Sequence, residues 1–239
     1  MLESNRIIQG LWIGESLSIL QQLCIKSFLY HGHAFHLYVY NSVKSIPAGT
    51  IVKDANEVIN SKHIMKDKFG SYATFSDWFR IGLLFKHGGW WVDMDTICLQ
   101  AFDFEEEYVF SSELAGTAEK IANAPIKCPK NSAFMKECLG VIKQKDLSKI
   151  EWGEVGARLL QQHIEKYNFW HFIADPNMFN PIPYDHFSLL FTNVNIDFSE
   201  ETHAVHFWNE MLRRNSIDTN LNFHQKSFFE RVKLKYLKP

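Results

Sequence analysis

The sequence predicts a single α/β domain in which helices flank a Rossmann-like, mostly parallel central sheet. Three observations support this fold class. Residues 1–40 show a strand, a helix and a strand in succession, the unit that joins neighbouring parallel strands. A longer apolar helix then ends at a double glycine and leads directly into an apolar strand. Finally, 239 residues that are 46% hydrophobic and 15% aromatic can bury one sizeable core.

The N-terminal elements follow from hydrophobic spacing. We expect a strand at residues 7–13, a helix at 16–28 capped by Ser16, and a second strand at 34–40. A turn around Pro47 and a short helix at 54–59 come next. The helix expected at residues 71–86 stops at Gly88 and Gly89, because glycine readily adopts the left-handed conformation that ends a helix.

The pattern weakens beyond residue 100. It indicates helices near 131–143 and 155–167, a Pro-rich loop at 175–184 and a last strand at 202–207. The final segment, Ser227 to Pro239, interleaves apolar and basic residues. It is typical of a solvated last helix or of a basic amphipathic tail resting on an anionic membrane, and both interpretations stay open.

Composition excludes some classes of function. The 25 Lys and Arg residues against 27 Asp and Glu leave a formal charge of −2, so no overall basic field favours nucleic acid. The first residues, MLESNR, do not resemble a secretory signal, and no stretch reaches the roughly 20 apolar residues of a membrane span. We therefore expect a cytoplasmic protein. Its cysteines show no CxxC spacing and are expected to be buried or half-buried free thiols: Cys24, Cys98, Cys128 and Cys138.

Two aspartates follow the apolar run Trp90-Trp91-Val92. Side chains alternate along a strand, so Asp93 and Asp95 are expected to point the same way while Met94 faces the core. At the carboxyl end of a strand they would project into the crevice where open α/β sheets bind ligands. Carboxylate oxygens there suit Mg²⁺ or Mn²⁺ bridging a diphosphate. A solvated turn carrying two acids is the simpler alternative.

Asp77 and Arg80 lie three residues apart on the preceding helix. They could form an ordinary helical ion pair. If the Gly-Gly turn brings this helix near the strand, both could instead face the crevice. Asp77 would then accept hydrogen bonds from sugar hydroxyls, and Arg80 would donate to sugar or phosphate oxygens.

The run Ser76-Asp77-x-x-Arg80 followed by Gly88-Gly89-x-x-x-Asp93-x-Asp95 resembles the DXD region of sugar-nucleotide-dependent glycosyltransferases, most closely glycosyltransferase family 32. Two further segments resemble this family in the same order. They are Trp12-Ile13-Gly14, where an aromatic residue packs on the donor base, and His206-Phe207-Trp208-Asn209-Glu210, which approaches the metal and the diphosphate.

The resemblance implies a GT-A fold, a divalent cation, most often Mn²⁺ but also Mg²⁺, and sugar transfer with retention at the anomeric carbon. It implies a catalytic role for Asp77, Arg80, Asp93 and Asp95, and a metal site formed by Asp93, Asp95 and His206. The donor would be a UDP-sugar, or else a GDP-sugar. The residues implied to bind this nucleotide sugar are Trp12, Ile13, Asp77, Arg80, Gly89, Asp93, Met94, Trp208 and Asn209.

The same resemblance divides the single domain into residues 1–100, which bind the nucleotide sugar, and 101–226 on the acceptor side, followed by the tail at 227–239. The sugar moved would be a hexose or N-acetylhexosamine, and the acceptor a glycan or a lipid-linked glycan. By analogy the product would be a bacterial capsule or lipopolysaccharide, made at the inner face of the membrane.

Some roles stay open. A covalent mechanism would need a second acid, and Glu113, Glu154 and Asp175 are candidates without a supporting motif, so no nucleophile is assigned. The segment from Gly153 to Gly156 lies where related enzymes place a glycine turn near donor or acceptor, but without the familiar Gly-Pro pair.

Two other functions compete with sugar transfer. A binding module could keep the pocket without turnover. The run WWVDMDTI also fits the first motif of haloacid-dehalogenase phosphatases, with Asp93 as nucleophile and Asp95 as acid/base. That chemistry requires a later Lys and a further acidic pair that binds Mg²⁺, typically in the pattern DD or GDxxxD, and neither acidic pattern occurs after residue 96.

Overall fold

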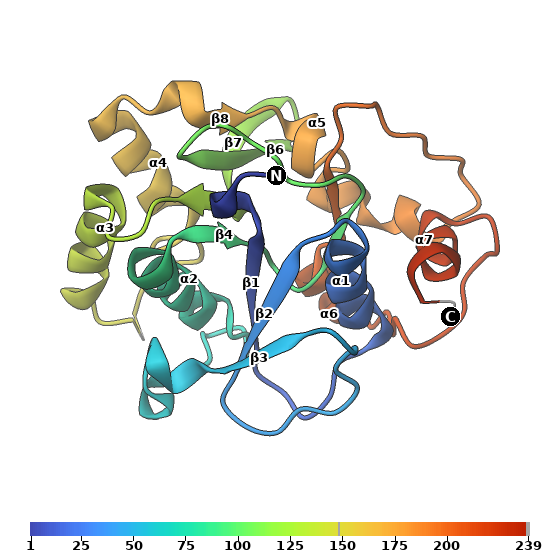
Figure 1. Ribbon diagram of the computed structural model, residues 1–239, viewed down its shortest axis with the longest axis horizontal. Helices are drawn as coiled ribbons and strands as arrows, with labels where there is room; N and C mark the ends of the chain where they lie inside the picture. Colours follow the sequence, from blue (N-terminus) through green and yellow to red (C-terminus); the bar gives the residue numbers. More distant parts are fainter. Residues whose placement is uncertain (148, 238–239) are drawn as a thin grey trace.

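A seven-stranded sheet runs through the centre of the structure, a computed structural model that describes residues 1–147 and 149–237 (Figure 1). The strand order is β3-β2-β1-β4-β7-β6-β8, and β7 alone runs against the other six. The mostly parallel sheet expected from the sequence is therefore present. The bounds are β1 Ile7–Trp12, β2 Ala34–Val39, β3 Ile51–Asp54, β4 Gly89–Trp91, β6 Val109–Ala115, β7 Ala118–Cys128 and β8 Ile173–Ala174.

Helices cover both faces of this sheet, giving three layers. On one face α1 (Ile19–Tyr30) packs against α7 (Phe228–Tyr236), and on the other α2 (Ala73–His87), α3 (Ala133–Lys143) and α4 (Ala157–Tyr167) pack side by side (Figure 1). Adjacent residues of β4 point to opposite faces of the sheet. Trp90 packs in the core beneath α1, and Trp91 packs in the core beneath α2. The two hydrophobic cores explain why the strand is apolar at every position.

A two-stranded antiparallel sheet forms beside the first. Its strands are β5 (Thr96–Cys98) and β9 (Ala204–His206). Their pairing connects a segment near the C-terminus to the middle of the chain. The remaining short helices are η1 Glu3–Asn5, η2 Ala55–Glu57, η3 Ser61–His63, η4 Trp170–Phe172, α5 Pro176–Phe179, η5 Tyr184–Phe191 and α6 Asn209–Arg214.

The first helix begins later than the sequence predicted. Ser18, not Ser16, is the N-cap, because its side chain accepts from the backbone of the first turn and Gln21 bonds back to the Ser18 amide. Ser16 lies before the helix, where its carbonyl accepts from the Trp12 indole at 3.1 Å and its backbone forms an isolated bridge with Lys44.

Three other parts of the prediction were incomplete. The short helix expected at 54–59 is a 3₁₀ turn at Ala55–Glu57 that follows the unpredicted edge strand β3. The hairpin of β6 and β7 was missed, because β7 carries Pro125 and charged residues that obscure strand periodicity. Part of the expected loop at 175–184 forms the short helix α5.

The C-terminal segment is part of the core. On α7 the apolar residues Phe228, Phe229, Val232 and Tyr236 are buried, so the membrane-facing apolar surface that the sequence suggested is used inside the protein. Leu234 is exposed on the outer side of the helix. Lys238 and Pro239 lie outside the described residues. This segment is therefore a helix whose apolar side belongs to the core, which neither interpretation of the sequence anticipated.

Replacing Phe229 by Ala should lower the free energy of unfolding by about 3–5 kcal/mol, because the fully buried ring packs against Phe191, Phe207 and Phe223. Leu234→Ala on the same helix is the control and should change stability by about 0.5 kcal/mol or less. Urea denaturation measures both. Equal effects of the two substitutions would contradict the packing of α7.

No helix among the described residues is long and apolar enough to cross a membrane. All four cysteines are free and buried, as the sequence predicted. Burial raises the pKa of Cys128 to about 12, so this thiol stays protonated at neutral pH.

Buried histidines should make the fold sensitive to acid. His33 Nδ1 lies 2.9 Å from the carbonyl of Asn5, and its Nε2 accepts from the amide of Phe102 at 3.0 Å, which requires a neutral ring. Burial lowers the pKa of His33, and it lowers that of His31 to about 4. A base whose folded pKa lies below 6.5 contributes stability that is complete above pH 6.5 and is lost as pH falls through the folded pKa.

We therefore expect the melting temperature to fall between pH 6.5 and 5, and His33→Gln to flatten that dependence. An amide retains one donor and one acceptor but cannot be protonated. His186→Gln at an exposed position is the control. An unchanged slope in His33→Gln would show that this contact does not set the acid sensitivity. Thermal denaturation followed by circular dichroism across this pH range makes the measurement.

Candidate active site

Asp93 and Asp95 lie just beyond the carboxyl end of β4, the edge predicted from the sequence. They are not on the strand itself. The strand ends at Trp91, and the amide of Thr96 donates to the carbonyl of Asp93 at 3.0 Å, closing a turn between β4 and β5. Met94, between them, is buried in the core, as expected.

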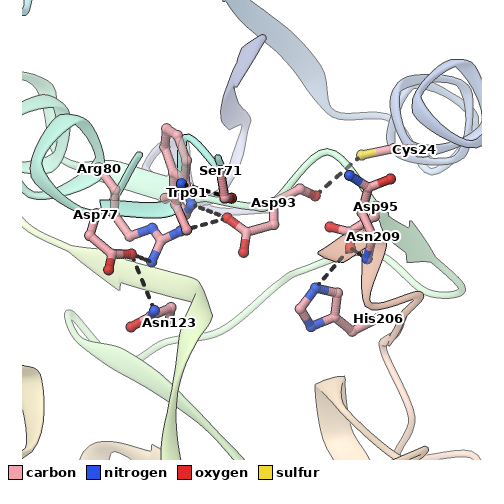
Figure 2. Close-up of polar contacts among 11 residues, drawn as sticks. Cys24, Ser71, Asp77, Arg80, Trp91, Asp93, Asp95, Asn123, His206 and Asn209 are labelled. Atoms are coloured by element: carbon pink, nitrogen blue, oxygen red, sulfur yellow. Dashed lines mark hydrogen bonds and ion pairs between the residues drawn. The ribbon is translucent and has the colours of Figure 1, made fainter. Parts of the chain in front are cut away.

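Strand pairing brings His206 to this turn. Thr96 of β5 is opposite His206 of β9, and the amide of Phe207 donates to the carbonyl of Asp95 at 2.9 Å. His206 Nε2 then lies 3.1 Å from Asp95 Oδ2, which also accepts from the backbone amide of Asn209 (Figure 2). Ligand atoms of Asp93, Asp95 and His206 all lie within 4.8 Å of one another.

The Asp95 and His206 pair is buried, and each residue favours the charged form of the other. Burial opposes ionisation of Asp95, but the adjacent imidazole and the Asn209 amide outweigh it and hold the pKa of this carboxyl below its usual range. Burial likewise opposes protonation of His206, but Asp95, Asp93 and Glu113 outweigh it and raise the pKa of the ring. His206 Nδ1 is buried and has no hydrogen-bond partner in the described protein.

Arg80 links α2 to the aspartate turn. Its guanidinium donates to Asp77 Oδ1 at 2.9 Å and to Asp93 Oδ1 at 2.7 Å, and it lies over the ring of Trp91 at 5.3 Å (Figure 2). The Trp91 indole also donates to Asp93 Oδ1, at 2.9 Å. Asp77 and Arg80 thus form the helical ion pair that the sequence allowed, and Arg80 also bonds Asp93 of the aspartate turn.

Asn123 is a site residue that the sequence analysis missed. Its side-chain amide donates to Asp77 Oδ1 at 3.2 Å from β7, a strand without a clear periodic signal (Figure 2). The Asn123 Oδ1 atom is buried without a partner. Gly156 closes the same corner, since a Cβ at this position would stand 2.4 Å from Asp77 Oδ2 and 2.7 Å from Asn123. The glycine segment at 153–156 therefore touches the site.

Asp77 differs from Asp95 in that its pKa is raised rather than lowered. Burial raises its pKa to about 6 against the opposing effect of Arg80. A buried carboxyl that takes up a proton near neutrality can either accept or donate a hydrogen bond to a polar ligand.

The other predicted donor-binding residues are scattered. Trp12 and Ile13 lie at the carboxyl end of β1, the same edge of the sheet as Asp93, and Trp208 stacks near His206 with ring centroids 4.0 Å apart. Gly89 lies at the opposite end of β4, against Gln9 and Ile7, so the structure does not bring it to this edge.

The three candidate acids have different surroundings. Glu154 pairs with Lys145 at 2.6 Å, and Asp175 caps α5 by accepting from the amide of Asn177. Glu113 is half-buried on β6, and its charge contributes to the raised pKa of His206. Burial raises the pKa of Glu113 as well. Of the three, Glu113 alone is electrostatically coupled to the cluster.

Comparison with known proteins agrees with this site. Residues 21–112 match a family described as a glycosyltransferase sugar-binding region containing a DXD motif. The matched segment includes Asp77, Arg80, Asp93 and Asp95. This match supports a glycosyltransferase enzyme and covers the DXD region rather than the whole chain. A search of curated proteins found no match.

Several solved structures share part of the architecture. PaToxG glycosyltransferase is 17% identical, with 68% of this chain and 69% of that chain covered and a TM-score of 0.49. A transferase mutant is 12% identical, with 78% of this chain and 91% of that chain covered and a TM-score of 0.46. The apo form of glycosyltransferase GlyE from Streptococcus pneumoniae TIGR4 is 10% identical over 72% and 45%, with a TM-score of 0.40.

Proposed function

We propose that this chain is a metal-dependent, retaining glycosyltransferase of the family 32 type, which moves a hexose or N-acetylhexosamine from a UDP-sugar to a glycan or glycolipid acceptor. The observation that carries the proposal is the cluster of Asp93, Asp95 and His206 at the carboxyl edge of the sheet. Its two aspartates lie inside the segment that matches a DXD sugar-binding region.

The donor set fits a divalent cation. Two ligands held about 2.1 Å from a metal at adjacent octahedral positions stand about 3.0 Å apart, and Asp95 Oδ2 lies 3.1 Å from His206 Nε2. Asp93 Oδ1 is taken by Arg80 and Trp91, which leaves Oδ2 for a metal or a ribose hydroxyl. Two carboxylates with one imidazole favour Mn²⁺ over Mg²⁺, since Mg²⁺ prefers oxygen ligands alone.

A bound cation would neutralise the charge that grows on the departing nucleoside diphosphate. The protein groups perform the remaining tasks. Arg80 is held by Asp77 and Asp93 and keeps the Asp93 carboxylate in place. Asp77 and Asn123 present polar atoms to the sugar hydroxyls. Trp208 and Asn209 follow β9 and cover the Asp95 side of the site, where they exclude water.

Other parts of the proposal rest on the resemblance alone. They are retention of the anomeric configuration, the use of GDP-sugars as second donors, a role in bacterial capsule or lipopolysaccharide synthesis, the donor and acceptor halves, and a cytoplasmic location. Contact with an anionic membrane would have to use the basic side chains of α7, such as Lys235, since its apolar face is buried.

The test is to incubate the purified chain with Mn²⁺ and, in turn, UDP-glucose, UDP-galactose, UDP-GlcNAc, UDP-GalNAc and GDP-mannose, and to measure the nucleoside diphosphate released. Metal-dependent release from one donor is expected. Donor binding without release would favour the silent binding module instead. If no donor is bound or cleaved, the proposal fails. Release of inorganic phosphate from a phosphate monoester would favour the phosphatase.

A further inference from the structure

An exposed aromatic cluster lies at the margin of the site. Phe69 and Trp152 meet edge to face with ring centroids 6.0 Å apart, although 48% and 45% of their respective surfaces are exposed. The Arg214 guanidinium lies over both rings, 5.6 Å from the centroid of Phe69 and 5.3 Å from that of Trp152. We refer to Phe69, Trp152 and Arg214 as the aromatic platform.

The platform joins three segments that each touch the site. Phe69 precedes α2, which carries Asp77 and Arg80. Trp152 precedes Gly156, which packs against Asp77. Arg214 ends α6, and the amide at the start of that helix bonds Asp95. The six residues of α6 span about 9 Å, so the backbone of Arg214 lies about one short helix length from the amide that donates to Asp95.

Hydrogen bonds stabilise the three segments of the platform. Glu210 accepts from Arg214 at 2.8 Å and from Arg213 at 2.7 Å, and Arg213 also donates to the carbonyl of Phe69. Arg158 donates to the carbonyl of Trp152 at 2.7 Å. Single exposed aromatic residues are common on protein surfaces, but here Arg214 contacts both rings and two further arginines bond the backbone that carries them, an arrangement that favours preorganised binding of a ligand.

The chemistry of the platform suits a sugar ring. A pyranose has an apolar face of C–H groups, which stacks on an aromatic ring, and a rim of hydroxyls, which bond Arg and Glu side chains. Asp77, Arg80 and the cluster already account for the donor sugar and the diphosphate. A ring stacked on the exposed Trp152 would therefore approach the site from outside.

We propose that the platform, with Trp152 as the stacking surface, binds a pyranose ring of the acceptor. The inference rests on the proposed function, because an acceptor exists only if sugar is transferred. It narrows the acceptor to a carbohydrate or to the carbohydrate part of a glycolipid.

Binding is tested without donor or metal by saturation-transfer NMR. The full chain is mixed in turn with methyl glycosides of glucose, galactose, mannose and N-acetylglucosamine, and with lactose and cellobiose. We expect transfer to the ring C–H protons of at least one sugar, its loss in Trp152→Ala and its retention in Trp152→Tyr. Trp170→Ala is the matched control, since Trp170 is 48% exposed on η4. If no sugar shows transfer that depends on Trp152, the inference is wrong.

Kinetics separate this inference from the proposed function. With a sugar that binds, Trp152→Ala should raise the acceptor KM about tenfold while kcat falls less, because stacking contributes binding rather than chemistry. Trp170→Ala should leave both constants unchanged. Donor cleavage in the wild type with no change of acceptor KM in Trp152→Ala would reject the platform alone. Sugar binding that depends on Trp152 without any donor cleavage would reject the proposed function, and with it the acceptor role, and would leave the platform as a sugar-binding site.

Discussion

Asp95→Asn should abolish metal-dependent release of nucleoside diphosphate, lowering its rate by about a thousandfold or more, because in the proposed function this carboxylate is a metal ligand and supplies charge to the cluster. The substitution preserves shape. An amide oxygen can still accept from the backbone of Asn209, and the amide nitrogen can donate to His206 Nε2. We therefore expect a folded protein.

Metal binding provides a second measurement for this variant. Titration of Mn²⁺ into the apo chain, followed by isothermal calorimetry, should give an affinity at least about tenfold weaker in Asp95→Asn than in the wild type. Asp185→Asn, at an exposed position on η5, is the control and should bind Mn²⁺ as the wild type does. Wild-type Mn²⁺ affinity in Asp95→Asn would remove this residue from the metal site.

Arg80→Ala should both destabilise the fold and inactivate the enzyme. Arg80 is 3% exposed and is the shared counter-ion of Asp77 and Asp93, so its loss leaves the buried Asp77 carboxylate without a positive charge beside it. Breaking such a pair on one side costs about 3–5 kcal/mol. Arg6→Ala removes an exposed pair with Glu3 and should cost less than about 1 kcal/mol. Urea denaturation at pH 7.5 compares the two.

The pH dependence identifies the cause of the loss. Asp77 already has its pKa raised to about 6, so its ionisation costs stability as pH rises from 3.8 through 6. Without Arg80 this pKa rises further, so the loss of stability should grow above pH 6. The double variant Arg80→Ala with Asp77→Asn should regain much of the stability but none of the activity. If stability is not regained, the orphaned Asp77 charge is not the cause.

The sequence was informative where a motif and a hydrophobic pattern coincided. The helix before Gly88, the apolar strand after it and the two aspartates were predicted at the correct edge of the sheet. Their exact placement was wrong, because β4 ends at Trp91 and a turn positions the carboxylates. The hairpin of β6 and β7 was not predicted, and Asn123 was missed with it.

The amino-acid sequence by itself determined the α/β class, the DXD segment and the residue types of the metal site, since local spacing and short motifs encode these features. The tertiary structure decided which distant residues contact the DXD segment. Pairing of β5 with β9 places His206 beside Asp95, and Gly156 closes on Asp77. It also decided that the basic tail is a core helix, because only long-range packing shows which apolar surface is already covered.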